Sequence, residues 1–219
     1  MSLTCAVGDI HGSLSKLRNL LSRCEEHAEG RSVTFVFLGD YIDRGPDAAG
    51  VVGLLIDLEA KARERIIALM GNHEAMALDV IDGNMPEEFW LSQGGAETLK
   101  SYAVVRPRDL PRRHVDWLRS LRLTYDDGRR FFVHAGVDPE KALDAQDNED
   151  LIWIREPFLS HAGDYGRLIV HGHTPLPTGL PDLRSNRLNL DTGAVYGGPL
   201  TAAVFDTAQA KPIAFIQAD

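Results

Sequence analysis

Short polar segments rich in Gly, His and Asp recur along this chain, and most of them follow an apolar, β-prone run. In open α/β sheets, ligands gather outside the carboxyl ends of the strands, so these segments predict one shared site on strand-end loops. Their carboxylate, amide and imidazole groups form the ligand mixture that borderline-hard divalent metals prefer. The pattern therefore predicts a preassembled metal site, and hence an enzyme. The segments are 8–12, 39–45, 71–74, 134–136 and 171–174.

The length and charge of the chain limit the remaining possibilities. Its 219 residues, 44% of them hydrophobic, are enough for a single domain over 1–219 with a substantial core. The formal net charge of −9 argues against binding to nucleic acid or to anionic membranes. No apolar stretch is long enough to span a bilayer and no targeting pattern is visible, so we expect a cytoplasmic protein.

The order of the apolar patterns indicates the fold class. Strand patterns at 3–7, 33–38 and 66–70 are separated by helical patterns after Ser13 and from Pro46, which predicts parallel strands with helical crossovers. Segment 84–121 is mostly helical and is expected to form an insertion beside the site. We expect two β-layers flanked by helices. The later strands are predicted at 121–125 and 130–134, which form a hairpin, and at 168–170, 188–190, 200–205 and 213–216.

Six side chains in the polar segments are candidate metal ligands. Asp9 and His11 are two residues apart, and on an extended segment that spacing places both side chains on the same side. Asp40 could bridge two ions through its two carboxylate oxygens. Each pattern alone is more often structural, so the prediction depends on the ordered set. Asn72 adds an amide oxygen, and His134 and His173 add imidazoles.

The motifs GDxHG, GDxxDRG, GNHE, HAG and HGHT resemble those of the phosphoprotein phosphatase family within the calcineurin-like metallophosphoesterases. The resemblance runs from Gly8 to about Leu200, and segments 90–95 and 191–195 resemble the compact bacterial and phage branch. It implies the calcineurin-like fold, a two-layer β-sandwich of mixed sheets flanked by helices. Many metallophosphoesterases carry a second histidine two residues after the one at position 173, where this chain has Pro175, which favours the phosphatase branch over nucleases.

The resemblance implies a binuclear metal centre and the residues that hold it. Asp9, His11 and Asp40 would hold the first ion, and the second would be held by Asp40, Asn72, His134 and His173. His171 would not be a ligand. Two Mn²⁺ ions are favoured, and Fe or Zn²⁺ would also suit these ligands. Two ions about 3.5–4 Å apart can acidify a shared water and hold it for in-line attack on phosphorus.

Four further residues are expected to act on the substrate. Guanidinium groups suit bidentate contacts with phosphate, and the resemblance assigns Arg44 and Arg155 to this role. His73 is the candidate general acid for the leaving alkoxide, and Asp43 is the candidate partner that holds it and favours its charged form. For Asp191 a role in a turn is favoured over one at the site entrance. A contact between Tyr196 and the phosphate is left open.

These observations favour a metal-dependent phosphatase, most specifically a serine/threonine protein phosphatase. Its partner would be a phosphorylated protein or a small phosphoester. The alternative is a symmetrical diadenosine tetraphosphate hydrolase, because both reactions need the same ions, arginines and acid. The two would differ in the groove walls at 84–121, 139–147 and 175–187, which the sequence alone does not decode. A noncatalytic binding module is disfavoured, because neither the ligand set nor the acid has a gap.

Overall fold

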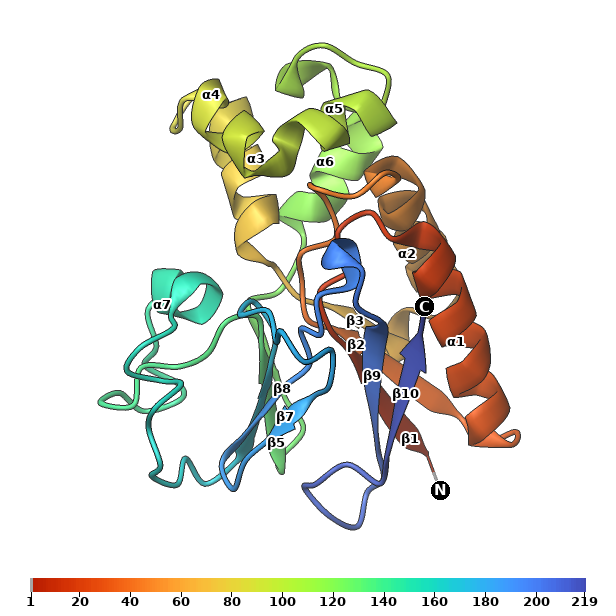
Figure 1. The fold of residues 1–219 in the computed structure, drawn as a ribbon, viewed down its shortest axis with the longest axis vertical. Coiled ribbons are helices and arrows are strands. Elements are labelled where there is room, and N and C mark those ends of the chain that lie inside the picture. Colours follow the sequence, from red (N-terminus) through yellow and green to blue (C-terminus); the bar gives the residue numbers. More distant parts are fainter. Residues whose placement is uncertain (1) are drawn as a thin grey trace.

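The computed structural model describes residues 2–219, and its strands form two five-stranded sheets (Figure 1). The first sheet has the order β10-β9-β1-β2-β3. Strands β1, β2 and β3 are parallel to one another, as predicted. Strand β9 pairs antiparallel with β1, and β10 pairs antiparallel with β9. The strands are β1 (Leu3–Val7), β2 (Val33–Phe37), β3 (Ile66–Ala68), β9 (Leu200–Phe205) and β10 (Ala214–Ala218).

The second sheet has the order β4-β5-β6-β8-β7 and is also mixed. The predicted hairpin is confirmed by the antiparallel pair β4–β5, and β5, β6 and β8 run parallel. Strand β7 was not predicted, because two residues are too few to show a period of alternation. The strands are β4 (Thr124–Asp126), β5 (Arg130–Val133), β6 (Leu168–His171), β7 (Asp182–Leu183) and β8 (Arg187–Asn189).

Strand β1 shows why the central strands are apolar throughout. Alternate side chains of a strand point to opposite faces of its sheet. Cys5 and Val7 belong to the core beneath the helices, whereas Ala6 belongs to the core shared with the second sheet. In that second core, Val36 packs in one cluster with Phe132 and Val170 of the other sheet. The fold is therefore the predicted sandwich of two mixed sheets flanked by helices.

Helices α1 (Leu14–Ala28) and α2 (Ala48–Ala62) lie beside the first sheet on its outer face (Figure 1). Helix α2 begins two residues later than the sequence indicated from Pro46. The reason is Asp47, which is the N-cap and whose carboxylate accepts a hydrogen bond of 2.9 Å from the backbone N–H of Gly50.

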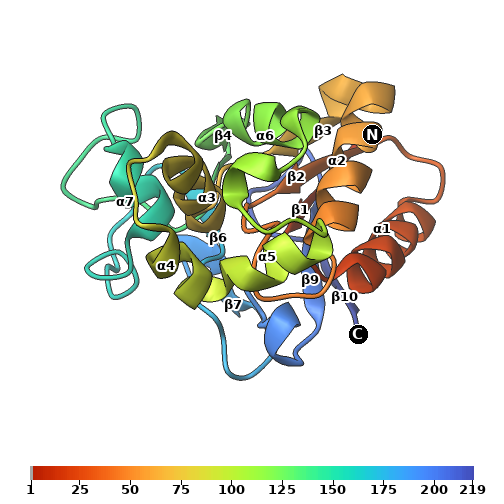
Figure 2. The ribbon, with the colours of Figure 1, turned by 90° about the horizontal axis from the view of Figure 1, so that it is seen from above.

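Most of the remaining helices lie at the end of the molecule toward which β1 and β2 run (Figure 1). Helix α3 (Asn72–Asp82) follows β3, and segment 84–121 contributes the helices that lie beside it (Figures 1 and 2). These are α4 (Glu87–Trp90), α5 (Ala96–Ser101) and α6 (Arg112–Arg119). The chain kinks at Gly94, where the backbone has φ 110° between α4 and α5. Helix α7 (Asn148–Trp153) lies beside the second sheet.

None of the helices within residues 2–219 has both the length and the apolar character needed to cross a membrane. The cytoplasmic location stays a prediction.

Candidate metal centre

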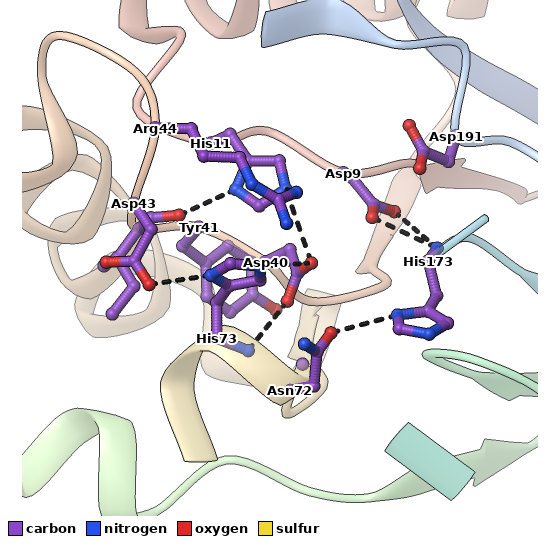
Figure 3. A network of polar contacts seen from close by, with 12 residues as sticks. Asp9, His11, Asp40, Tyr41, Asp43, Arg44, Asn72, His73, His173 and Asp191 are labelled. Atoms are coloured by element: carbon purple, nitrogen blue, oxygen red, sulfur yellow. Dashed lines mark hydrogen bonds and ion pairs between the residues drawn. The ribbon is translucent and has the colours of Figure 1, made fainter. Parts of the chain in front are cut away.

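The polar segments meet at one place, as the sequence predicted (Figure 3). Asp9 and His11 follow β1, and Asp40 follows β2. Asn72 and His73 open α3 just after β3, so the same loop that ends the strand delivers both side chains. His134 and His173 follow β5 and β6 of the second sheet. The site therefore joins the two sheets at the carboxyl ends of their parallel strands.

Two overlapping triads have the geometry of metal ligands, and Asp40 belongs to both. The first consists of His11, Asp40 and His73, and the second of Asp40, His134 and His173. Within each triad the potential ligand atoms lie within 4.8 Å of one another, and all of these residues are buried. Asp40 Oδ2 is 3.4 Å from His11 Nε2, and Oδ1 is 3.4 Å from His134 Nε2. The two carboxylate oxygens of Asp40 thus face different triads, which fits a bridging role.

The hydrogen bonds of His134 fix which of its nitrogens is free for a metal. Its Nδ1 lies 2.9 Å from the carbonyl oxygen of Leu38, which can only accept, so Nδ1 carries the proton. Burial lowers the pKa of His134, so the ring is neutral and Nε2 has a bare lone pair. That lone pair faces Asp40 Oδ1 and, at 3.0 Å, Asn72 Oδ1. A cation is the group that suits three lone pairs pointing at one place.

His11 repeats this arrangement in the other triad. Its Nδ1 donates to the carbonyl oxygen of Ile42 over 2.8 Å. Burial lowers the pKa of His11 to about 3, so its Nε2 is also unprotonated. It faces Asp40 Oδ2 and accepts a hydrogen bond of 2.9 Å from Arg44 Nη1. The donor set therefore fits divalent metals in both triads.

Asp9 is placed differently from the sequence expectation. The idea of an extended segment was wrong, because His11 has φ 44°, in the left-handed region. The Asp9 carboxylate accepts hydrogen bonds of 3.1 and 3.2 Å from the backbone N–H of His173 and belongs to neither triad. Burial and the neighbouring carboxylates of Asp191 and Asp40 raise the pKa of Asp9. A concentration of buried acids of this kind favours a cation nearby.

His73 and Asp43 form the pair that the sequence predicted. His73 Nδ1 lies 2.7 Å from Asp43 Oδ2, and both side chains are buried. Asp43 also accepts hydrogen bonds from the indole N–H of Trp90 (2.8 Å) and the hydroxyl of Thr98 (2.7 Å), so its carboxylate is fixed. Burial lowers the pKa of His73, but Asp40 and Asp43 outweigh it and raise the pKa above its usual value. This direction is opposite to that of His11 and His134.

Glu74 is a site residue that the sequence reasoning missed, although it stands in the GNHE motif. Its Oε2 accepts hydrogen bonds from the backbone N–H groups of Asp40 (2.9 Å) and Gly71 (3.0 Å). Its Oε1 accepts from those of Tyr41 (2.8 Å) and Ile42 (3.2 Å). The fully buried carboxylate therefore ties the Asp40 loop to the start of α3. Ligand chemistry could not reveal it, because all of these partners are backbone groups.

Replacing Glu74 by glutamine should destabilise the fold and weaken metal binding together. The new amide nitrogen cannot accept, so two buried N–H groups lose their partner at a cost of about 2–6 kcal/mol in total. Urea unfolding measures the stability, and metal analysis of the purified protein measures the ion content. The matched control is Glu140→Gln, because Glu140 is exposed and its carboxylate has no such role. A Glu74→Gln protein as stable as the control would contradict this assignment.

Arg44 and Arg155 reach the same small cavity as the triads. This cavity has a volume of about 210 Å³ and is bordered by Asp40, Asn72, His73 and His173 as well as the two arginines. The backbone N–H of Arg44 donates to Gly94 O over 3.0 Å, so the kink of the helical segment holds this residue in place. Both candidate phosphate ligands thus lie where a phosphoryl group would meet the triads. Gln93, Trp153, Pro175 and Tyr196 complete the lining.

Three further residues that the sequence singled out have defined places. The ring of His171 packs against Phe158 with centroids 4.9 Å apart, and His171 belongs to neither triad. Asp191 Oδ1 accepts a hydrogen bond of 3.1 Å from Gly193 N, as the turn interpretation expects, and it also lies beside Asp9 (Figure 3). Tyr196 lies against Arg44, whose Cζ is 5.8 Å from the ring centroid.

A fold of two mixed sheets with this cluster of carboxylate, amide and imidazole groups at their strand ends defines a class of metal-dependent phosphoesterase. The family model described as calcineurin-like phosphoesterase matches residues 4–203, and the chain belongs to this family. It is 32% identical over 207 residues to serine/threonine-protein phosphatase 1 of Salmonella typhimurium, a match that covers 90% of this chain and 89% of that protein.

Two further similarities cover nearly the whole chain. The asymmetrical bis(5'-nucleosyl)-tetraphosphatase PrpE of Oceanobacillus iheyensis is 28% identical, over 91% of this chain and 87% of that protein. The solved structure of a protein serine/threonine phosphatase from Saccharomyces cerevisiae has a TM-score of 0.65 at 16% identity, and the match covers 100% of this chain and 80% of that one. The structural match supports the fold, and the sequence relatives have different substrates.

Proposed function

We propose that this protein is a serine/threonine protein phosphatase that hydrolyses phosphomonoesters with the help of two divalent metals. The observation that carries the proposal is the buried His73–Asp43 pair, of which His73 belongs to the first triad and lines the cavity that the two arginines also border. The alkoxide of serine or threonine is a poor leaving group and needs a proton as the P–O bond breaks. A site with an acid of this kind is suited to alkyl phosphates.

Six side chains would hold the metals. Asp9, His11 and Asp40 are proposed for one ion and Asp40, Asn72, His134 and His173 for the other, with Mn²⁺ favoured among metals that accept these ligands. When bound, two divalent ions would acidify a water and offset the charge of the phosphate. Direct metal analysis tests this ligand set, because Asp9 lies outside the first triad and His73 lies within it.

The remaining polar residues of the cavity would act on the substrate itself. Arg44 and Arg155 would bind phosphoryl oxygens, because a guanidinium group presents two parallel donors. His73 Nε2 would give its proton to the leaving oxygen. Asp43 would hold the ring through Nδ1 and favour the charged form, and its own position depends on Trp90 and Thr98.

The second candidate, a symmetrical diadenosine tetraphosphate hydrolase, is favoured by a separate cavity of about 560 Å³ near the site. It is lined by Lys16, Arg18 and the segment that flanks Tyr196. Cationic and apolar groups in a space of this size suit a nucleoside with a distal phosphate. The 32% identity to a serine/threonine-protein phosphatase supports the first candidate.

A substrate panel after metal reconstitution separates the two candidates. We expect a phosphoserine peptide to be hydrolysed with a higher kcat/KM than diadenosine tetraphosphate, and activity to disappear with a chelator and return with Mn²⁺. Para-nitrophenyl phosphate serves as a reference substrate, because its leaving group departs without a proton and its hydrolysis does not need the general acid. If the dinucleotide is preferred by orders of magnitude, the ranking is reversed, and if every phosphoester is left intact, the proposal fails.

A further inference from the structure

The N-terminus of helix α1 opens into a second cavity, separate from the one at the triads. This cavity has a volume of about 560 Å³, and it shares none of its lining residues with the cavity of about 210 Å³ at the triads. It lies between the start of α1, the start of α2 and the turn that precedes β9 (Figure 1). The two cavities are therefore distinct binding spaces.

The first turn of α1 presents backbone N–H groups that have no acceptor. Within residues 2–219, the N–H groups of Leu14, Ser15 and Lys16 take part in no hydrogen bond. Free N–H groups at a helix N-terminus and the positive end of the helix dipole both attract anions. The turn contains no acidic side chain that could take this place. An anion from outside the chain would satisfy these groups.

The side chain of Ser13 independently points to a ligand. Ser13 is the N-cap of α1, a position where a hydroxyl ordinarily accepts from an N–H group of the first turn. Here the hydroxyl makes no capping hydrogen bond, because the backbone has φ −83° and ψ 59° and turns away from the usual N-cap conformation. The residue is only 8% exposed, and it lines the cavity. A hydroxyl held at a cavity wall with its hydrogen-bonding capacity unused suits a ligand oxygen.

Two cationic side chains border the same space. The Lys16 ammonium group donates to the carbonyl oxygens of Ala194 (3.1 Å) and Gly198 (2.6 Å), which fixes its charge at the cavity wall. Arg18 lies on the same helix and also lines the cavity. Asp47, the one carboxylate in the described lining, is already engaged by the backbone at the start of α2. The local charge is therefore positive, although the chain as a whole carries −9.

The size of the cavity and its remaining lining describe the other part of the ligand. A volume of about 560 Å³ lies within the range of about 300–1,000 Å³ that is usual for small-molecule sites, and a phosphate ion alone would fill only a small part of it. The ligand therefore combines an anionic group with an apolar body. The apolar side chains that line the cavity are Leu14, Pro46, Ala194 and Val195.

We propose that the N-terminus of α1 is a second, noncatalytic binding site that takes a phosphate monoester. The phosphate accepts hydrogen bonds from the N–H groups of the first turn and from the Ser13 hydroxyl, and Lys16 and Arg18 offset its charge. The organic group lies against the apolar wall. The bound ester is not cleaved here, because no residue of the two triads lines this cavity. The inference goes beyond the proposed function and holds whichever phosphoester is hydrolysed at the triads.

Alkylphosphonates test this site, because a phosphatase does not hydrolyse their P–C bond. Two-dimensional amide NMR spectra of the protein loaded with diamagnetic Zn²⁺ report on each backbone N–H group separately. We expect methylphosphonate to shift the signals of Ser15 and Lys16 to saturation. Propylphosphonate should bind there about tenfold more tightly, because two further methylene groups become buried. The signal of Asn72 reports on the catalytic cavity in the same spectra, so failure at one site is distinguishable from failure at the other.

Screening by salt is the alternative explanation for such shifts. A titration with sodium chloride at equal ionic strength measures it. Signals of the first turn that respond equally to chloride and to both phosphonates would overturn the proposal.

Ser15→Asp should fill the site from within the chain. A carboxylate in the first turn of α1 would interact with the free N–H groups and the helix dipole. The variant should therefore be at least as stable as the unaltered protein in urea unfolding, and phosphonate affinity at α1 should fall at least tenfold. Asn19→Asp is the charge-matched control, because Asn19 is exposed one turn further along α1 and does not line the cavity.

Ser13→Ala removes the hydroxyl and leaves the charges in place. We expect phosphonate affinity at α1 to fall about tenfold, as for the loss of one hydrogen bond to a charged group, while the response of Asn72 stays unchanged. Unchanged affinity at α1 in either Ser15→Asp or Ser13→Ala would refute the site, whatever the outcome of the substrate panel.

Discussion

Asp40→Asn should remove bound metal and activity together. Asp40 belongs to both triads, so the substitution takes a carboxylate charge from each ion at once. A metal centre supplies several kcal/mol of charge stabilisation in the transition state, so we expect kcat to fall by about 10³-fold or more. Metal analysis should find fewer than two ions per chain, and phosphatase assays should follow that loss.

The substitution is suited to the backbone at this position. Asp40 has φ 53°, in the left-handed region, and asparagine tolerates that region as well as aspartate does. The variant should therefore keep its circular dichroism spectrum. Asp116→Asn is the matched control, because Asp116 is exposed on α6. An Asp40→Asn protein that retains two tightly bound ions would contradict the bridging role.

His73→Asn should lower turnover severely while metal content stays near normal. Loss of a general acid costs about 10²–10⁴-fold. The loss should be greatest for a phosphoserine peptide and much smaller for para-nitrophenyl phosphate, because nitrophenolate leaves without a proton. The turnover of Asp43→Asn should lie between that of His73→Asn and that of the unaltered protein. This substitution removes only the partner that orients the His73 ring and favours its charged form. Steady-state kinetics on both substrates and metal analysis of the same preparations check these expectations.

The same variant decides between two roles for His73. Its Nε2 is 4.0 Å from Asp40 Oδ2 and takes part in the first triad, as a ligand would. Loss of metal from His73→Asn would make it a ligand or a structural residue and would leave the acid unassigned. His27→Asn serves as the control, because His27 is exposed near the end of α1.

The sequence predicted the strands that are buried on both faces, because they appear as continuous apolar runs. Leu200–Phe205 was predicted at its true bounds, and its six residues are all buried. Helix α7 was missed, because it begins inside the polar stretch 138–150. In that stretch Lys141 pairs with the carboxylates of Asp138, Asp147 and Asp150 at 2.7–3.0 Å, contacts that charge counting cannot reveal.

Some features of the site could be predicted from the sequence and others could not. The His73–Asp43 pair and the joint use of Asp40 could be inferred, because they follow from residue types in motifs. The conformation of His11 and the four backbone partners of Glu74 could not, because they depend on the path of the chain rather than on side-chain chemistry. The aromatic border of the cavity was anticipated only in part: a role for Tyr196 was left open, and Trp153 was not singled out, because it belongs to none of the polar motifs.

The helical segment 84–121 contains groups that hold Asp43, the partner of the proposed proton donor His73. Trp90 and Thr98 fix Asp43, and Gly94 O fixes Arg44, whereas the triads are built entirely from other parts of the chain. Metal affinity and leaving-group preference can therefore evolve separately in this architecture. Exchanging this segment between relatives would alter which esters are cleaved while the sandwich continued to bind its ions.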